Sequence, residues 1–476
     1  MTTVVPVTDI LAEIRGVSPT EHPGSIPIPD AATRETIAWI TPAKSGDARE
    51  AVAAAALAQR AWEAAGAGHR NAIILKIADA IEAESERLAV LLSRETGKPL
   101  NGPNARFEIG AATAWLRATA ALELKDELLF EDGGKAAYLK YDALGVVAAI
   151  TPWNWPVMIA VWQIAPALKA GNAVVIKPSE YTPLSVAALV SVMNRFLPRD
   201  VLTAVAGGPE LGAELATDPG LAKIMFTGST ATGRRIVEAS AGNLARMTLE
   251  LGGNDPAIVL PDVDPEQIAE VLFWGAFVNT GQTCAAIKRL YVHERIYDEV
   301  VERLASIAST TPMGPGLEEN NVLGPLQNHR QFDIVANLVR DARERGARIA
   351  AGGHPAPDLG PLFFEPTIVA DVTDDMSLVK EEQFGPVLPV IKYADLNHAI
   401  ELANALPQGL AASVWSADLD AAKAVANRLE AGTVWINQHA APHPLVPFGG
   451  IKGSGYGLEF GIDGLKAVSR PKVISY

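Results

Sequence analysis

Short apolar runs alternate with helix-forming segments from Tyr138 onward, and this alternation constrains the fold more than any other feature of the chain. Four such runs each lead into a turn and a helix, at residues 146–150, 173–176, 202–205 and 223–226. This is the pattern of a parallel sheet with crossover helices. A similar alternation restarts after Gly252-Gly253, with strand-like residues 257–260 and 290–292 ahead of a helical segment at 294–307. The sequence therefore predicts two α/β domains that meet at Gly252-Gly253.

The composition is that of an ordinary globular enzyme, and it excludes several other classes of protein. Hydrophobic residues make up 49% of the 476-residue chain and charged residues 20%, which are usual values. The net charge of −15 argues against nucleic acid or an anionic membrane as a partner, because both attract clustered Lys and Arg. A single cysteine excludes an internal disulfide and a cysteine-rich zinc or iron–sulfur centre, so no metal site is expected.

One uncharged stretch, residues 143–168, is long enough to cross a bilayer. Three prolines interrupt it, and Asn154 and Gln163 lie inside it, so a lipid-facing helix would leave backbone groups without partners. A buried strand, a Pro-Trp loop and a core helix fit this stretch better, and we expect no membrane span. Residues 1–10 lack a basic region followed by an apolar core and a cleavage site, so we expect no secretory signal and a cytoplasmic protein.

Two alanine-rich segments near the start, residues 48–65 and 71–94, have apolar residues at helical spacing and predict amphipathic helices. Gly97-Lys98-Pro99 ends the second helix. Residues 125–141, with Asp132-Gly133-Gly134 at their centre, predict a two-stranded ribbon between these helices and the first sheet. Because an isolated hairpin is marginally stable in water, we expect the ribbon to pack on another subunit or domain. A plain surface flap is the alternative.

Two turns at the ends of predicted strands could contact a nucleotide, although the chain has no Gly-x-Gly-x-x-Gly fingerprint. Gly228-Ser-Thr-Ala-Thr-Gly233 opens a helix that starts near Gly233, whose amides could receive a pyrophosphate. Arg234-Arg235 stands where a Walker loop needs Lys and Ser or Thr, which excludes a nucleotide triphosphatase. Lys177 and Glu180 follow another strand, at an edge where α/β sheets bind ligands. Taken alone, the first segment could be only a tight turn and the second only a solvated turn.

Cys284 is the candidate nucleophile. A free cysteine is usually an inert, buried small hydrophobe, but this one ends the polar segment Asn279-Thr-Gly-Gln-Thr-Cys284. Upstream, Glu250 is flanked by leucines and followed by two glycines, a setting that raises a carboxyl pKa and allows action as a base near neutrality. Since the thiolate is the nucleophile, a nearby base makes chemical sense. Residue types alone leave both the inert and the reactive interpretation open.

Seven short segments together resemble the aldehyde dehydrogenase superfamily, of the NAD(P)-dependent, non-acylating kind. They run in the family's order from about residue 30 to the C-terminus, and the first thirty residues match no part of it. The segments are Thr151-Pro-Trp-Asn-Trp-Pro156, Lys177-Pro-Ser-Glu180, Phe226-Thr-Gly-Ser-Thr230, Leu249-Glu-Leu-Gly-Gly253, Gly281-Gln-Thr-Cys284, Glu381-Glu-Gln-Phe-Gly-Pro386 and Pro447-Phe-Gly-Gly450.

The resemblance implies an α/β fold with two parallel-sheet (Rossmann-like) domains and a small β-ribbon for oligomerisation. Residues 1–124 and 142–251 would form the NAD(P)-binding domain, and residues 252–450 the catalytic domain. Residues 125–141 and 466–476 would form the oligomerisation ribbon of a homodimer or homotetramer.

The resemblance also implies catalytic roles. Cys284 would attack the aldehyde carbonyl to form a thiohemiacetal and, after hydride transfer, a thioester. Asn154 and the backbone N–H of Cys284 would hold the oxyanion, and Glu250 would activate the water that releases the acid. Relatives that pass the acyl group to coenzyme A generally lack a glutamate at this place, so Glu250 favours hydrolysis.

NAD is the cofactor that the resemblance implies, with NADP as the alternative. Glu382 would hold the nicotinamide ribose, with Phe384 beside the ring. Lys177 and Glu180 would bond the adenosine ribose, and Glu180 favours NAD because a carboxylate repels a 2′-phosphate. The full set of expected cofactor residues is Trp153, Lys177, Ser179, Glu180, Gly228, Ser229, Glu382 and Phe384.

An apolar, partly aromatic substrate tunnel is expected beside the cysteine. Its expected lining is Trp155, Met158, Trp162, Val278, Thr283 and His443. The loop before Pro447 would cover the mouth, and it contains no arginine that could bind a terminal carboxylate. The predicted substrate is therefore a neutral aromatic or medium-chain aldehyde, with a semialdehyde as the alternative.

Three other functional classes stay open at this point. A cofactor-free cysteine hydrolase could use Cys284 and Glu250 and would form no NADH. An aldehyde dehydrogenase that acylates coenzyme A would depend on coenzyme A for turnover. A binding protein on an inactive dehydrogenase scaffold would be unaffected by Cys284→Ser.

Overall fold

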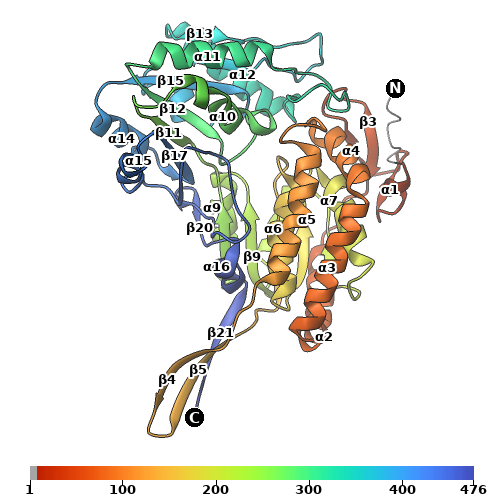
Figure 1. The fold of residues 1–476 in the computed structure, drawn as a ribbon. Coiled ribbons are helices and arrows are strands. Elements are labelled where there is room, and N and C mark those ends of the chain that lie inside the picture. Colours follow the sequence, from red (N-terminus) through yellow and green to blue (C-terminus); the bar gives the residue numbers. More distant parts are fainter. Residues whose placement is uncertain (1–7) are drawn as a thin grey trace.

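The structure is a computed structural model that describes residues 8–476, and it contains two large sheets covered by helices (Figure 1). The prediction that residues 1–10 carry no secretory signal depends largely on residues 1–7, which lie outside the described residues. No helix within residues 8–476 is long and apolar enough to cross a membrane. Residues 143–168 instead form the predicted strand, loop and helix.

The first sheet has six strands in the order β20-β10-β9-β6-β7-β8. Five of them run parallel: β6 (Val146–Ile150), β7 (Ala173–Lys177), β8 (Leu202–Ala204), β9 (Leu221–Thr227) and β10 (Arg246–Glu250). The edge strand β20 (Gly455–Tyr456) pairs antiparallel with β10. Successive side chains of a strand point to opposite faces, so Val147 and Ala149 pack in one apolar cluster while Val146 and Ala148 pack in another.

Helices cover both faces of this sheet. One face packs against α3 (Ala67–Ala83), α5 (Ala105–Ala121), α6 (Pro156–Lys169) and α7 (Pro183–Asn194). The other face packs against α2 (Asp47–Ala64), α8 (Pro209–Ala216) and α9 (Thr230–Ala239).

The prediction of a single helix at residues 71–94 is wrong. The chain forms two helices, α3 and α4 (Ser85–Thr96), which are broken at Glu84 with φ −97° and ψ 8°. The Glu84 carboxylate pairs with Arg87 and Arg195 at this corner. Apolar residues continue at helical spacing across the break, so periodicity alone could not reveal it.

The second sheet has seven strands in the order β13-β14-β15-β12-β11-β17-β18. Six run parallel: β11 (Asp255–Val259), β12 (Ile287–His293), β14 (Thr367–Ala370), β15 (Val387–Tyr393), β17 (Ala411–Trp415) and β18 (Thr433–Ile436). The edge strand β13 (Arg348–Ala351) is antiparallel. The chain passes from the first sheet to this one between β10 and β11, where Gly252-Gly253 lies.

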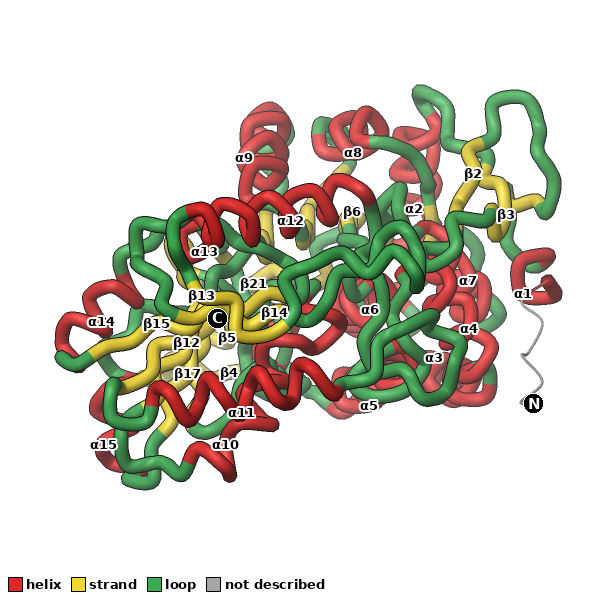
Figure 2. Tube along the Cα trace, turned by 90° about the horizontal axis from the view of Figure 1, so that it is seen from above, coloured by secondary structure: helices red, strands yellow, loops and turns green. Residues whose placement is uncertain are grey.

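Helices also cover both faces of the second sheet (Figure 2). On one face lie α10 (Pro265–Phe277) and α11 (Tyr297–Thr310), and on the other lie α12 (His329–Glu344), α14 (Leu396–Asn404) and α15 (Leu419–Ala426). The helix predicted at residues 294–307 begins later, at Tyr297, because a turn closed by the Ile296 N–H and the His293 carbonyl precedes it.

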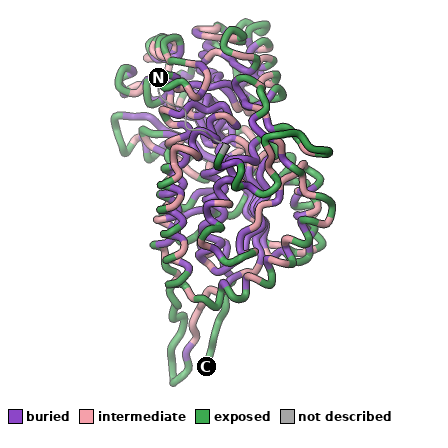
Figure 3. Tube along the Cα trace, turned by 90° about the vertical axis from the view of Figure 1, so that its right-hand side faces the viewer, coloured by how far each residue is buried: buried purple, intermediate pink, exposed green. Residues whose placement is uncertain are grey.

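The predicted ribbon is present and gains a third strand. β4 (Glu127–Asp132) and β5 (Lys135–Ala143) form a hairpin, and β21 (Ser469–Ser475) pairs with β5. The ribbon projects away from the two sheets (Figure 1), and most of it is exposed (Figure 3). Its exposed apolar side chains are Leu128, Leu129, Phe130, Val473 and Ile474. A partner subunit that covers them stays a prediction.

Short elements complete the described chain, among them the 3-10 helices η1 (Ser240–Gly242) and η2 (Val278–Gly281). The others are α1 (Thr8–Ala12), β1 (Val17–Ser18), β2 (Ile26–Pro29), β3 (Thr36–Ile40), α13 (Ser377–Lys380), β16 (Gln408–Gly409), β19 (Ile451–Lys452) and α16 (Gly461–Ala467).

Candidate active site

Two neighbouring cavities lie where the carboxyl ends of β6, β7, β9 and β10 meet, at the sheet edge where open α/β sheets bind ligands. Their volumes are about 560 and about 200 Å³. Both are lined by Trp153, Gly228 and Ser229. The larger is also lined by Lys177, Ser179 and Glu180, and the smaller by Asn154, Glu250, Cys284, Glu382 and Phe384. Every predicted catalytic and cofactor residue therefore lies on the walls of these two cavities.

Cys284 lies on the loop between α10 and β12, and the backbone before it is strained. Asn279 and Thr280 have φ of 52° and 57°, in the left-handed region that residues other than glycine rarely adopt. Gly281 has φ 74°, and a side chain there would collide with neighbouring backbone. Lys288 donates to the Gly281 carbonyl over 2.7 Å. Surrounding contacts thus hold a bent loop that presents the thiol.

Three carboxyl groups lie close enough to the half-buried thiol to affect its charge. Burial raises the pKa of Cys284 to about 12, and the nearby carboxylates of Glu382, Asp255 and Glu250 also raise it. The sulfur therefore carries its proton near neutral pH, and it must lose that proton to act as a nucleophile.

Glu250 lies at the end of β10, where burial raises its pKa well above the usual range and the charge of Glu459 raises it further. Neither carboxyl oxygen of Glu250 has a hydrogen-bond partner among residues 8–476. Gly449, in the glycine-rich turn near the C-terminus, leaves room for this group, since a Cβ there would lie 3.3 Å from its Oε1. A carboxyl group made more basic by burial suits a general base.

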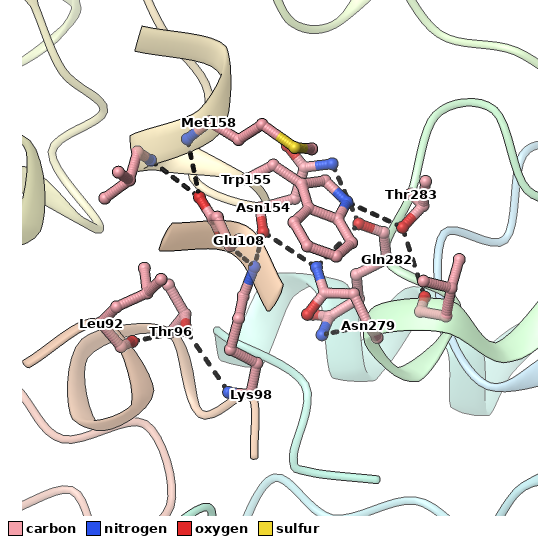
Figure 4. Close-up of polar contacts among 12 residues, drawn as sticks. Leu92, Thr96, Lys98, Glu108, Asn154, Trp155, Met158, Asn279, Gln282 and Thr283 are labelled. Atoms are coloured by element: carbon pink, nitrogen blue, oxygen red, sulfur yellow. Dashed lines mark hydrogen bonds and ion pairs between the residues drawn. The ribbon is translucent and has the colours of Figure 1, made fainter. Parts of the chain in front are cut away.

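Asn154 lies on the loop between β6 and α6 and is held from two sides (Figure 4). Its side-chain amide donates to the carbonyl of Gln282 over 2.9 Å, two residues before Cys284. Its own carbonyl accepts from Lys98 Nζ over 2.7 Å and from the Asn279 amide over 2.9 Å. An amide nitrogen carries two hydrogens, so one remains for an oxyanion.

Glu382 and Phe384 lie on the loop before β15. Burial raises the pKa of Glu382 to about 8, and the positive charge of Lys288 opposes this shift. Glu382 Oε1 has no hydrogen-bond partner among residues 8–476. The Phe384 ring meets Trp153 edge to face, with 5.3 Å between ring centroids. A free acceptor beside two rings could hold a ribose hydroxyl and a planar heterocycle.

Lys177 and Glu180 follow β7 at the other end of the larger cavity. Lys177 is buried and donates to the Pro178 carbonyl over 3.2 Å; burial lowers its pKa, while Glu180 raises it. Ser229 caps α9, since its Oγ accepts from the Thr232 N–H over 3.3 Å. The helix therefore begins at Thr230, earlier than predicted, and its first N–H groups form a potential anion site.

The predicted tunnel residues do not line these two cavities. Four of them lie in or against the apolar cluster that Cys284 also contacts: Trp155, Met158, Trp162 and Val278. Thr283 Oγ1 accepts from Trp155 Nε1 over 2.9 Å. His443 is exposed, and its Nδ1 accepts from the Leu445 N–H within the same loop.

The structure adds side chains that the sequence did not single out. Trp162 packs on Trp115 of α5 and on Phe460, with centroid distances of 5.5 and 4.6 Å. Glu459, beside Glu250, and the buried pair of Lys98 and Glu108 were also missed. Lys98 lies in the Gly-Lys-Pro segment that the sequence indicated only as a helix end. The signal available in the sequence was a charged residue among apolar neighbours at Lys98, Glu108 and Glu459. The partners of these residues are visible only in the packed structure.

Within residues 8–476, no group of three or more His, Cys, Asp or Glu side chains is arranged to hold a metal ion. Extended cavities at the carboxyl edge of a parallel sheet are typical of α/β enzymes that bind a nucleotide cofactor. Comparison with known families is more specific. The chain belongs to the aldehyde dehydrogenase family, whose model matches residues 18–474.

Relatives match over nearly their whole length. The chain is 40% identical to phenylacetaldehyde dehydrogenase of Pseudomonas fluorescens over 460 residues, which cover 94% of this chain and 91% of that protein. It is 38% identical to human retinaldehyde dehydrogenase 3 over 450 residues, covering 93% and 88%. The crystal structure of PnpE in complex with nicotinamide adenine dinucleotide superposes with a TM-score of 0.92 at 36% identity, covering 95% and 94%. The predicted family and fold are thus confirmed, but the expectation that the first thirty residues match no part of the family is wrong, because the match begins at residue 18.

Proposed function

We propose that this chain oxidises an aldehyde to the free carboxylic acid with NAD, through a thiohemiacetal and then a thioester on Cys284. The observation that carries the proposal is that Cys284, Asn154 and Glu250 line one cavity, which adjoins a larger one. Family membership supports the same class of reaction.

Each of the three side chains has a separate task. The Cys284 sulfur attacks the aldehyde carbon, and the amide of Asn154 with the N–H of Cys284 binds the oxygen that becomes negative. Loss of one such donor typically lowers the rate by a factor on the order of 10²–10³. Glu250 then takes a proton from the water that attacks the thioester, and the acid leaves as Cys284 regains its thiol.

The cavity residues fit NAD. The free oxygen of Glu382 can accept from one ribose, Lys177 and Glu180 can bond the other, and the start of α9 at Ser229 can receive the pyrophosphate. When bound, NAD supplies the acceptor for the hydride that leaves the aldehyde carbon. Glu180 favours NAD over NADP, because a carboxylate repels a 2′-phosphate.

The substrate that we propose is a neutral aromatic or medium-chain aldehyde. Trp155, Met158 and Trp162 belong to the apolar cluster that Cys284 contacts, and the rings of Trp115 and Phe460 extend it. Apolar and aromatic walls bind such aldehydes through burial of hydrocarbon surface. The names of two relatives, a phenylacetaldehyde and a retinaldehyde dehydrogenase, agree with this chemistry.

We also assign the two sheets to separate domains and the ribbon to oligomerisation. Residues 1–124 and 142–251 would bind the cofactor, and residues 252–450 would carry the nucleophile. The exposed apolar side chains of residues 125–141 and 466–476 support a homodimer or homotetramer, which sedimentation of the purified protein would test.

The test of the proposed function is NADH formation over benzaldehyde, phenylacetaldehyde, hexanal and succinic semialdehyde, with NAD and NADP in parallel. We expect the highest kcat/KM for an aromatic or medium-chain aldehyde with NAD, and no turnover by Cys284→Ala. A higher kcat/KM for succinic semialdehyde would overturn the substrate proposal. A requirement for coenzyme A would overturn hydrolysis, and ester cleavage without any NADH would favour a hydrolase.

A further inference from the structure

Lys98 and Glu108 form an ion pair with no solvent exposure on either side chain. Lys98 Nζ lies 2.5 Å from Glu108 Oε2, 2.7 Å from the carbonyl oxygen of Asn154 and 3.8 Å from the centroid of the Trp155 ring. An ammonium group has three hydrogens; two of them have acceptors here, and the charge also lies over the Trp155 ring. Two of these three contacts are with the loop that carries Asn154.

The other oxygen of Glu108 reaches the same region. Glu108 Oε1 accepts from the N–H groups of Val157 and Met158, over 2.8 and 3.0 Å, in the first turn of α6. The N-cap residue of α6, Trp155, makes no capping bond with its own side chain, so a carboxylate from α5 satisfies these N–H groups. A negative charge at a helix N-terminus is also favourable to the helix dipole.

The Asn154 loop is bonded on its opposite side to the loop of the nucleophile. Besides the Asn154 amide bond to the Gln282 carbonyl, Trp155 Nε1 donates to Thr283 Oγ1, and the Asn279 amide bonds both the Asn154 and Gln282 carbonyls. Figure 4 shows the loop between the Lys98–Glu108 pair and this second set of bonds. The Asn154 loop thus connects Lys98, just after α4, and Glu108 of α5 to Gln282 and Thr283, the two residues before Cys284.

Stability alone gives a weak reason for such a pair. Two charges removed from water lose their hydration, and well-packed apolar residues often replace a buried ion pair without loss of stability. The contacts of this pair are directed at one peptide group and one helix start, both next to the proposed oxyanion donor. A role in fixing the position of Asn154 explains why the contacts of the pair are with these two groups.

We propose that Lys98 and Glu108 are positioning residues, which hold the Asn154 amide at the distance from Cys284 that oxyanion binding requires. This inference rests on the proposed role of Asn154. A displacement of about 1 Å in a reacting group can lower the rate by a factor on the order of 10². Without Lys98, the Asn154 carbonyl loses its charged donor and Glu108 is left as an unpaired buried charge.

The test compares kcat and KM of Lys98→Met and Glu108→Gln in the full-length protein. We expect each variant to lower kcat by a factor on the order of 10–100, with KM for NAD changed by less than about twofold. Glu108→Gln is nearly isosteric and keeps one oxygen for the α6 N–H groups, so it decides the question if Lys98→Met does not fold. An unchanged kcat in both folded variants would overturn the proposal.

A matched control is Lys169→Met. Lys169 is a buried lysine at the other end of α6, where it donates to Asn71 and to the Ala120 carbonyl over 2.6 and 2.8 Å. We expect this variant to lower Tm and to leave kcat per folded enzyme unchanged. A fall in kcat equal to that of Lys98→Met would mean that the loss of any buried lysine that contacts either end of α6 has the same effect, and would overturn the proposal.

Measuring the effect of Lys98→Met in the Asn154→Ala variant distinguishes a positioning role of Lys98 from a general structural role. If Lys98 acts through Asn154, then Lys98→Met should lower kcat by less than about twofold when Asn154 is already alanine. An equal loss in both backgrounds would overturn the inference. If Asn154→Ala itself keeps full activity, the proposed role of Asn154 fails; if it loses activity while Lys98→Met does not, only the positioning role fails.

Discussion

Cys284 should react slowly with a small neutral disulfide reagent, because its thiol holds its proton. Burial and the charges of Glu382, Asp255 and Glu250 raise its pKa to about 12, whereas an ordinary thiol titrates at about 8.5. At pH 8 the thiolate fraction is then about 1 in 10⁴ rather than about 1 in 4. The more basic thiolate is the better nucleophile, with a Brønsted slope of about 0.4–0.5, which recovers a factor of roughly 30–50. The net expectation is a reaction about 50–100-fold slower than that of a free thiol.

Because Cys284 is the only cysteine, mass spectrometry of the whole protein follows this one group without correction. The rate should rise about tenfold per pH unit, and still be rising above pH 9. Restricted access would slow the reaction without moving this pH dependence. A rate that is half-maximal near pH 8.5 and levels off by about pH 9.5–10 would refute the conclusion that burial and charge keep the thiol protonated.

A pair of variants tests the cause of the shift. Glu382→Gln removes the nearby carboxylate and should speed the reaction of Cys284, most clearly above pH 8, since the pKa of Glu382 is itself about 8. The exposed neighbour Glu381 offers the control, and Glu381→Gln should leave the rate unchanged. Equal effects of the two substitutions would contradict a local electrostatic cause.

Three further outcomes are expected. Asn154→Ala should lower kcat by a factor on the order of 10²–10³ in steady-state NADH assays; unchanged kcat would exclude it from the oxyanion site. Glu250→Gln should give a burst of NADH equal to the enzyme, followed by turnover slowed by a factor on the order of 10²–10⁴; slow NADH formation without a burst would contradict a role in acid release. Glu95 accepts from the N–H groups of Leu184 and Ser185, and burial raises its pKa from 4.5 to about 7. Because the folded pKa is the higher one, its stabilisation is complete below pH 4.5 and is lost as pH rises through 7. Glu95→Gln should remove about 3 kcal/mol of this pH dependence in urea unfolding at acidic and at slightly alkaline pH; an unchanged pH dependence would refute the assignment.

Local pattern predicted the parts of the fold that depend on neighbours in sequence. Apolar runs followed by turns gave the parallel strands β6, β7 and β9, and the edge where these strands end is the edge where the cavities lie. The break at Glu84 was not predictable from periodicity, because apolar residues continue at helical spacing across it. One partner of the Glu84 carboxylate, Arg195, lies far along the chain. Likewise, a single exposed histidine, His443, could not be distinguished in sequence from one that lines a tunnel.

The sequence predicted which residues line the candidate site, but it did not predict the contacts that hold those residues in place. Six of the seven ordered segments supply residues that line the cavities. Four of them lie at the carboxyl ends of β6, β7, β9 and β10, and the segments of Cys284 and Glu382 lie on loops that precede β12 and β15. The seven segments do not contain the residues that hold Asn154 in place, Lys98 and Glu108. Lys98 lies just after α4 and Glu108 lies in α5, and these two residues reach the Asn154 loop only when α5 packs on α6. Buried polar pairs of this kind depend on tertiary packing, which propensity and spacing do not describe.

The buried groups around the nucleophile share one electrostatic tendency. Burial raises the pKa of Glu250, Glu382, Asp255 and Cys284, and it lowers the pKa of Lys288, so each shift favours the neutral form. Attack by the sulfur requires the thiol to lose its proton, and the base that accepts this proton must itself be unprotonated, so the two protonation equilibria are linked. A pH profile of kcat should accordingly report the coupled set and not a single residue.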